Sequence, residues 1–160
     1  MKPVRSLSLV AKVFSICLLL ISIVNGEESE KRVKMKDLPK AVQATVREQI
    51  KGAKLIGLAK EVEDGKTFYE AELKVNGHNK DVLMDTEGAI VEVEEQVTLA
   101  SLPSQVKEGI EKNAAGGKIV NVESITKNNT LVGYEAHVKK AGKMIEIKVD
   151  PQGNLMTGDK

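Results

Sequence analysis

The two histidines are the first residues to consider for catalysis or metal binding. His78 lies beside a predicted turn, and His137 lies at an outward position of a predicted strand. An imidazole site needs further His, Cys or carboxylate ligands at a suitable spacing, and neither histidine has such neighbours along the chain. The sequence therefore predicts that both are solvated surface residues, that the chain has no catalytic residue, and that it binds no metal and no cofactor.

Acidic residues offer a weaker chemical signal. Asp81, Asp85 and Glu87 suggest calcium, but they lack the alternating ligand pattern of an EF-hand loop. The run at 92–95 contains three glutamates, which could bind a basic partner. The favoured interpretation is an acidic edge strand whose charge discourages aggregation. Neither motif predicts an enzyme, so we expect a non-enzymatic protein.

The first 26 residues differ in composition from the rest of the chain. Three basic residues, Lys2, Arg5 and Lys12, precede a run from 13 to 24 that is almost wholly apolar. This pattern is typical of a signal peptide, and the run is too short for a membrane-spanning helix. We predict a signal peptide at 1–26, a periplasmic or secreted protein, and no membrane attachment after removal of the leader. Cys17 would leave with it, so the mature chain would lack a thiol.

The charge of the mature chain excludes one class of partner. The chain has 24 Lys and Arg against 23 Asp and Glu, but three of the bases and none of the acids lie in the leader. The remainder is slightly acidic, with Lys and Glu interspersed. Nucleic-acid binding depends on a basic patch that neutralises phosphates, so no nucleic acid is expected.

The mature chain contains an internal repeat. Residues 37–56 resemble 101–120 at a constant shift of 64, and residues 69–88 resemble 134–153 at a shift of 65. One residue is therefore inserted in the second copy, and we expect it in a hairpin turn, where 63–66 faces 127–130, because turns tolerate insertions. A duplicated structural unit is the simplest explanation.

Each copy has the same predicted elements. A helix begins near 38 or 102, capped by Asp37 or Ser101 and followed by glycine. After the helix, apolar residues alternate with polar ones, and Asp64-Gly65 is a hairpin-turn dipeptide. The predicted fold class is α+β: two tandem repeats, each one α-helix packed on a four-stranded antiparallel meander sheet. The expected organisation is a linker at 27–36, a first repeat at 37–96 and a second repeat at 97–160.

The repeated pattern resembles the PepSY-like family, small secreted modules also described as β-lactamase-inhibitor-like domains. The residues that carry the resemblance are Asp37-Leu38-Pro39, the strand 68–72 and the turn 85–88, with Leu102-Pro103, 133–136 and 150–153 in the second copy. The resemblance implies tandem helix-plus-sheet units in a protein located outside the cytoplasm. It also implies a binding role, because members of the family are proposed to bind or restrain other proteins, peptidases among them. It implies no binding residues, since the shared positions are those of turns and core.

Outward strand positions are the best candidates for partner contacts. Phe68 has glycine as its repeat counterpart, so the fold does not require an aromatic there. We expect the chain to bind an unidentified protein or peptide through the outer sheet face. The alternative is a periplasmic small-ligand or ion sensor that uses the acidic turns or a cleft between the repeats. The candidate contacts are Phe68, Glu70, Glu72, Lys74, Glu135, His137 and Lys139.

Overall fold

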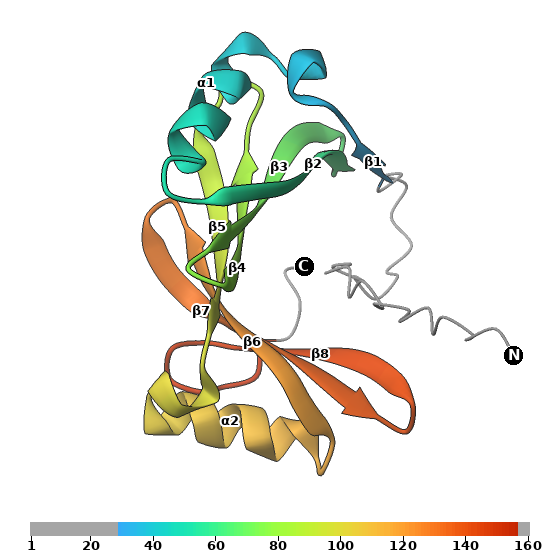
Figure 1. Ribbon diagram of the computed structural model, residues 1–160. Coiled ribbons are helices and arrows are strands. Elements are labelled where there is room, and N and C mark those ends of the chain that lie inside the picture. Colours follow the sequence, from blue (N-terminus) through green and yellow to red (C-terminus); the bar gives the residue numbers. More distant parts are fainter. Residues whose placement is uncertain (1–28, 157–160) are drawn as a thin grey trace, which may run out of the picture.

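Eight strands pair in sequence order into one antiparallel sheet (Figure 1). The computed structural model describes residues 29–156, so the predicted signal peptide at 1–26 lies outside the described residues. Two α-helices, each preceded by a short 3-10 helix, complete the fold. The strands are β1 Ser29–Arg32, β2 Lys54–Glu63, β3 Lys66–Val75, β4 His78–Met84, β5 Ile90–Val97, β6 Lys118–Lys127, β7 Thr130–Lys140 and β8 Lys143–Val149; the helices are α1 Lys40–Gln49 and α2 Ser104–Ala114.

The predicted fold class, two four-stranded sheets, is wrong. Strand β5 of the first unit pairs with β6 of the second, from Glu92 opposite Lys127 to Val97 opposite Val122, so both units share one sheet. An unpaired edge strand leaves a row of backbone N–H and C=O groups without partners, and joining the units removes one such edge from each. Sequence periodicity locates strands but does not reveal which edges meet.

The strand content of each unit also differs from the prediction. Strand β1, which falls in the predicted linker at 27–36, pairs with β2 and extends the sheet at one edge. The second unit was expected to have a fourth strand at 154–157; in the described part of that stretch, 154–156, the β-pairing is a single bridge between Val149 and Leu155. The first unit therefore contributes β1 to β5, and the second contributes β6 to β8.

Both helices pack on the same face of the sheet, at opposite ends of it (Figure 1). Val42 and Val46 of α1 and Val106 and Ile110 of α2 are fully buried against the strands. The apolar stripe of each helix meets the apolar side of the alternating strands, which is why each unit has its own core. We call the other side of the sheet the open face, since no described helix covers it.

The helices begin two residues later than predicted. Pro39 and Pro103 occupy the N-cap positions, and neither makes a side-chain capping hydrogen bond. Asp37 and Ser101 instead end the short 3-10 helices Met35–Asp37 and Leu99–Ser101, and the Ser101 hydroxyl donates to Thr98 O at 2.7 Å. The predicted caps are therefore wrong, because a 3-10 turn precedes each helix.

The residue inserted in the second copy lies in a strand, although the sequence predicted a turn. The turns at 64–65 and 128–129 have the same length, and both residues of each have positive φ, as tight hairpin turns require. In the β6–β7 pair, Ile125 faces Gly133 but Thr126 faces Leu131, which leaves Val132 as an extra residue. The insertion is a β-bulge, which accommodates one residue without changing the register on either side.

Candidate functional site

Carboxylates from all eight strands gather on the open face. Side chains alternate between the two faces along a strand, and the antiparallel register aligns the polar positions of neighbouring strands. Glu72, for example, lies opposite Asp81, which in turn lies opposite Glu94. The open-face acids are Glu30, Glu61, Glu70, Glu72, Asp81, Glu92, Glu94, Glu123, Glu135 and Glu146.

Burial, and then the crowding of these carboxyl groups, raises the pKa values of several of them. Burial, and then the charges of Glu61 and Asp81, raise the pKa of Glu70 to about 9. Burial and the charge of Glu123 raise the pKa of Asp81 to about 7. For Glu94, burial and the charge of Glu135 raise the pKa to about 8. Burial and repulsion between acids therefore disfavour ionisation on this face, and the repulsion crosses the junction between the two units, because Glu123 acts on Asp81 and Glu135 acts on Glu94.

One buried cluster stands at the β6–β7 part of the open face. His137 Nε2 lies 3.3 Å from Glu123 Oε2 and 3.2 Å from Glu135 Oε1. The three residues are only 6%, 3% and 2% exposed, respectively. Cross-strand pairing produces the cluster, because Glu123 lies directly opposite Glu135 and His137 is two residues further along β7.

Neighbouring side chains hold the outer oxygen of each carboxylate. Lys148 Nζ lies 2.8 Å from Glu135 Oε2, and Asn121 Nδ2 donates to Glu123 Oε1 at 2.8 Å. The second ring nitrogen of the histidine, Nδ1, lies 3.9 Å from Glu146 Oε1. Each carboxylate therefore keeps one oxygen directed at the imidazole while the other is held in place.

The cluster shifts the pKa values of its own members. Hydrogen bonds to Glu123 and Glu135 raise the pKa of His137 to about 10, despite burial. Burial would raise the pKa of Glu135, but hydrogen bonds from His137 and Lys148 outweigh it and lower that pKa. Paired opposite charges explain why these groups tolerate burial.

The structure places the predicted contact residues in three groups that differ in burial. Phe68, Glu70 and Glu72 are half-buried on the open face of β3, while Lys74 and its counterpart Lys139 are exposed near the ends of their strands. In the second unit, Glu135 and His137 belong to the buried cluster. The prediction that His137 is a solvated surface residue is wrong, because acidic side chains on adjacent strands enclose it.

Sequence reasoning missed Glu123 and Lys148. Both face β7 from neighbouring strands, opposite Glu135, and neither repeats a polar residue of the first copy. Their repeat counterparts are Ala59 and Leu83. The available signal was that the second copy departs from the first at these two positions. The signal could not be used without the strand register, which shows that both positions lie opposite Glu135.

The acidic turns after β4 and β8 have a structural role. Asp85 Oδ1 accepts hydrogen bonds from the backbone N–H groups of Glu87 and Ala89 at 3.0 and 2.8 Å. Asp150 does the same at the equivalent turn, and these bonds, chiefly those from Asn154, lower its pKa. These carboxylates close their own turns, as aspartate commonly does.

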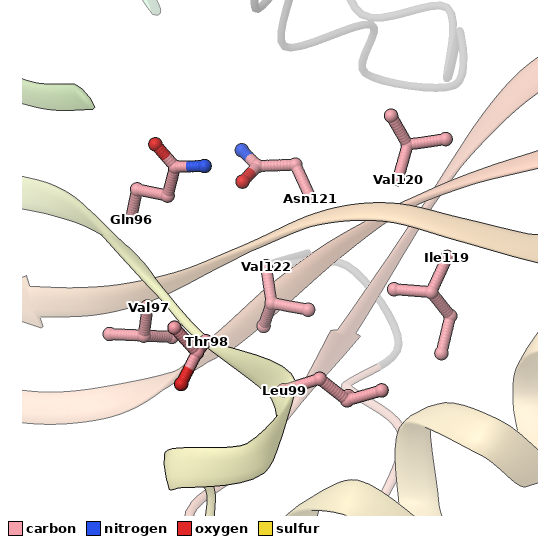
Figure 2. Close-up of a pocket in the computed structure, with 8 residues that line it drawn as sticks. All are labelled: Gln96, Val97, Thr98, Leu99, Ile119, Val120, Asn121 and Val122. Carbon is pink, nitrogen blue, oxygen red and sulfur yellow. The ribbon is translucent and has the colours of Figure 1, made fainter. Parts of the chain in front are cut away.

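A cavity of about 250 Å³ lies where the chain leaves β5 beside β6 (Figure 2). Val97, Leu99, Ile119 and Val122 lie on one side of β6, while Val120 and the amide groups of Gln96 and Asn121 lie on the other. Val120, at the rim, is the extra residue of a β-bulge and is 49% exposed, as is its counterpart Ile56 at 53%. The lining residues are Gln96, Val97, Thr98, Leu99, Ile119, Val120, Asn121 and Val122.

A family model described as "Putative beta-lactamase-inhibitor-like, PepSY-like" matches residues 25–92 and 67–157. The chain belongs to the PepSY-like family. The two matches together span all of the described strands and helices. The resemblance found in the repeated sequence is thus confirmed. None of the curated proteins compared with this PepSY-like chain matches it.

Solved structures share the fold of this PepSY-like protein. A periplasmic protein from Bacteroides eggerthii has a TM-score of 0.61 at 20% identity, over 75% of this chain and 86% of its own. A DUF2874 family protein from Bacteroides uniformis has a TM-score of 0.59 at 22% identity, over 74% and 86%. A BLIP-like protein from Bacteroides fragilis has a TM-score of 0.54 at 19% identity, over 75% and 84%.

The description of one similar protein names a location. The Bacteroides eggerthii protein is described as periplasmic, which agrees with the periplasmic or secreted location inferred from the leader. Among the described residues, neither helix has the length and apolar character needed to cross a membrane.

Proposed function

We propose that this PepSY-like protein is an exported, non-enzymatic binding module that holds a basic segment of another periplasmic or secreted protein on its open face. The observation that carries the proposal is the excess of carboxylates on that face. Burial and the charges of nearby acids raise the pKa of Glu70 to about 9, that of Asp81 to about 7 and that of Glu94 to about 8. A partner with Lys or Arg side chains would supply the missing positive charge.

Charge complementarity favours a basic partner over a neutral one. A cation placed near these carboxyl groups stabilises their ionised form and offsets the cost of ionising them. Half-buried Phe68 and Leu83, on adjacent strands of the same face, add apolar contact area. Long basic side chains suit such a surface, because their apolar stems pack while their charged ends pair.

The family supports an inhibitory outcome of binding. Its description is inhibitor-like, and the similar Bacteroides fragilis protein is described as BLIP-like. Restraint of an exported enzyme, such as a peptidase with a basic surface, is the role we propose. The carboxylates of Asp85 and Asp150 are engaged by their own turns, so the acidic turns do not favour the alternative of an ion sensor.

A lysine-rich peptide provides a direct test. Titration into isotope-labelled protein should shift the amide resonances of open-face residues in both units, and the apparent Kd should rise steeply with salt. Replacing three open-face acids with glutamine should weaken binding by about tenfold, at roughly 0.2–1 kcal/mol for each lost pair. The suitable positions are Glu30, Glu61 and Glu92.

The matched control removes the same charge from the helices. The triple variant at Glu48, Glu108 and Glu111, all exposed and all replaced by glutamine, has the same net charge as the open-face variant. It should bind the peptide like the unmodified protein. If the two variants lose equal affinity, or if the peptide shifts no open-face resonance at millimolar concentration, the proposal is wrong.

A further inference from the structure

We infer that Glu123, Glu135 and His137 form a binding site for one divalent transition-metal ion, with Zn²⁺ as the best match. The inference concerns a metal site on the open face and does not depend on a protein partner. The three side chains offer Glu123 Oε2, Glu135 Oε1 and His137 Nε2, all within 4.8 Å of one another. All three residues are buried, which distinguishes them from the exposed acidic side chains elsewhere on the surface.

The spacing of the three atoms matches the coordination geometry of zinc. Zinc binds imidazole nitrogen and carboxylate oxygen at about 2.0–2.2 Å, so two ligands at adjacent corners of a tetrahedron lie about 3.4 Å apart. The distances from Nε2 to the two carboxylate oxygens are 3.3 and 3.2 Å. An ion could therefore occupy the centre of the cluster with little movement of its ligands, and its binding would release the Nε2 proton that His137 directs at the two carboxylates.

The neighbouring residues hold the ligands in the way that metal sites require. Asn121 and Lys148 each bind the outer oxygen of one carboxylate, at 2.8 Å in both cases. Glu146 faces the second ring nitrogen of His137. Outer residues of this kind orient metal ligands, and a carboxylate behind a ligating histidine is a common arrangement.

The amide group of Asn121 adds an unsatisfied polar atom beside the cluster. The amide oxygen of Asn121, Oδ1, is buried and has no hydrogen-bond partner among the described residues. A buried oxygen left in this state is costly, and a metal ion or a metal-bound water would satisfy it. Asn121 lies directly opposite His137 in the β6–β7 pair, so this oxygen belongs to the same part of the open face.

The surrounding charge favours a divalent cation. Glu146 Oε1 lies 3.9 Å from Nδ1 of His137, so a third carboxyl group stands beside the two that would bind the ion. The ligand set selects zinc over calcium, because calcium prefers six to eight oxygen ligands whereas imidazole suits zinc and its neighbours in the periodic table.

The test is a titration of the purified, metal-free protein with zinc at pH 8, followed by calorimetry and by NMR of nitrogen-labelled histidine. We expect one zinc per chain and a large shift of the Nε2 resonance of His137. His137→Gln should weaken zinc binding by at least about tenfold. The matched control is His78→Gln, which replaces the exposed histidine at the start of β4 and should leave binding unchanged.

Two outcomes would overturn the metal site. One is zinc binding that survives in folded His137→Gln with unchanged affinity. The other is the absence of a saturable His137 shift in the unmodified protein at millimolar zinc, a measurement that does not depend on how the variant folds. Calcium in place of zinc should give no His137 shift. Because no peptide is present, failure here leaves the peptide experiment on the open face to be judged separately.

Discussion

Glu70 and Glu135 occupy equivalent positions in the two halves of the sheet, yet their pKa values shift in opposite directions. In the first unit, burial and neighbouring carboxylates raise the pKa of Glu70 to about 9. In the second, His137 and Lys148 lower the pKa of Glu135 although it is more completely buried. The backbone environment is the same, so the cross-strand neighbours decide whether the carboxylate ionises.

Three substitutions between the copies account for the difference. At the positions of Glu123, His137 and Lys148, the first unit has Ala59, Glu72 and Leu83. Each of these residues faces the shared glutamate position or lies next to it. The comparison teaches that two similar halves of one sheet can carry a buried ion cluster in one half and a protonated acid in the other.

The largest expected effect comes from making the second unit resemble the first at one position. His137→Glu places a third carboxylate beside Glu123 and Glu135, and we expect it to lower the free energy of unfolding at pH 7 by about 3–5 kcal/mol. The introduced carboxyl would have a raised pKa, so the loss should shrink as the pH falls to 5. Urea unfolding at both pH values measures this, with His78→Glu as the control. A loss below about 1 kcal/mol at pH 7 would show that the cluster does not depend on its charge balance.

The next prediction uses the same substitution at both equivalent glutamates. The pKa of Glu70 is 4.5 in the unfolded chain and about 9 in the folded protein, so its protonated form favours folding. This contribution is complete below pH 4.5 and is lost as the pH rises towards 9. Glu70→Gln should therefore raise the free energy of unfolding at pH 8 by about 1–2 kcal/mol and change it little at pH 4.

Glu135→Gln should have the opposite sign. The pKa of Glu135 is lowered in the folded state, so its contribution is present at pH 8 and is lost on acidification. We expect a loss of about 2 kcal/mol at pH 8. Denaturant curves of both variants at the two pH values test the comparison, and equal signs for the two variants at pH 8 would break it.

The smallest effect is expected at the exposed ion pair of the first unit. Arg32 Nη2 lies 2.6 Å from Glu72 Oε1, but the side chains of Arg32 and Glu72 are 42% and 24% exposed, respectively. Arg32→Gln should cost about 0.5 kcal/mol at low salt, and less at 1 M salt because exposed charges are screened. Thermal unfolding at both salt concentrations measures it. A salt-independent loss above 2 kcal/mol would mean that this pair behaves like the buried cluster.

Much of the local structure was predictable from the repeat. The hairpin turns at 64–65 and 128–129 follow from dipeptides that tolerate positive φ, and the structure confirms them. The helix starts were less predictable, because Pro39 and Pro103 fit both the first turn and the N-cap of a helix. The joining of β5 to β6 was not predictable, since strand edges carry the same backbone groups whatever their partner.

Only part of the candidate site was visible in the sequence. Alternation placed Glu70, Glu135 and His137 on the outward face, where the structure has them. It did not indicate that His137 is buried, because exposure depends on the side chains of neighbouring strands. Glu123 and Lys148 come from strands on either side of β7, and their meeting at Glu135 depends on register.

The sequence by itself indicated the PepSY-like family and the positions of the turns and alternating strands, because these are local properties of the chain. Only the tertiary structure decided that the copies share one sheet and that their acids lie together on one face. Electrostatic interactions act between atoms a few ångströms apart in space. Residues far apart in sequence acquire those distances only through the pairing of strands.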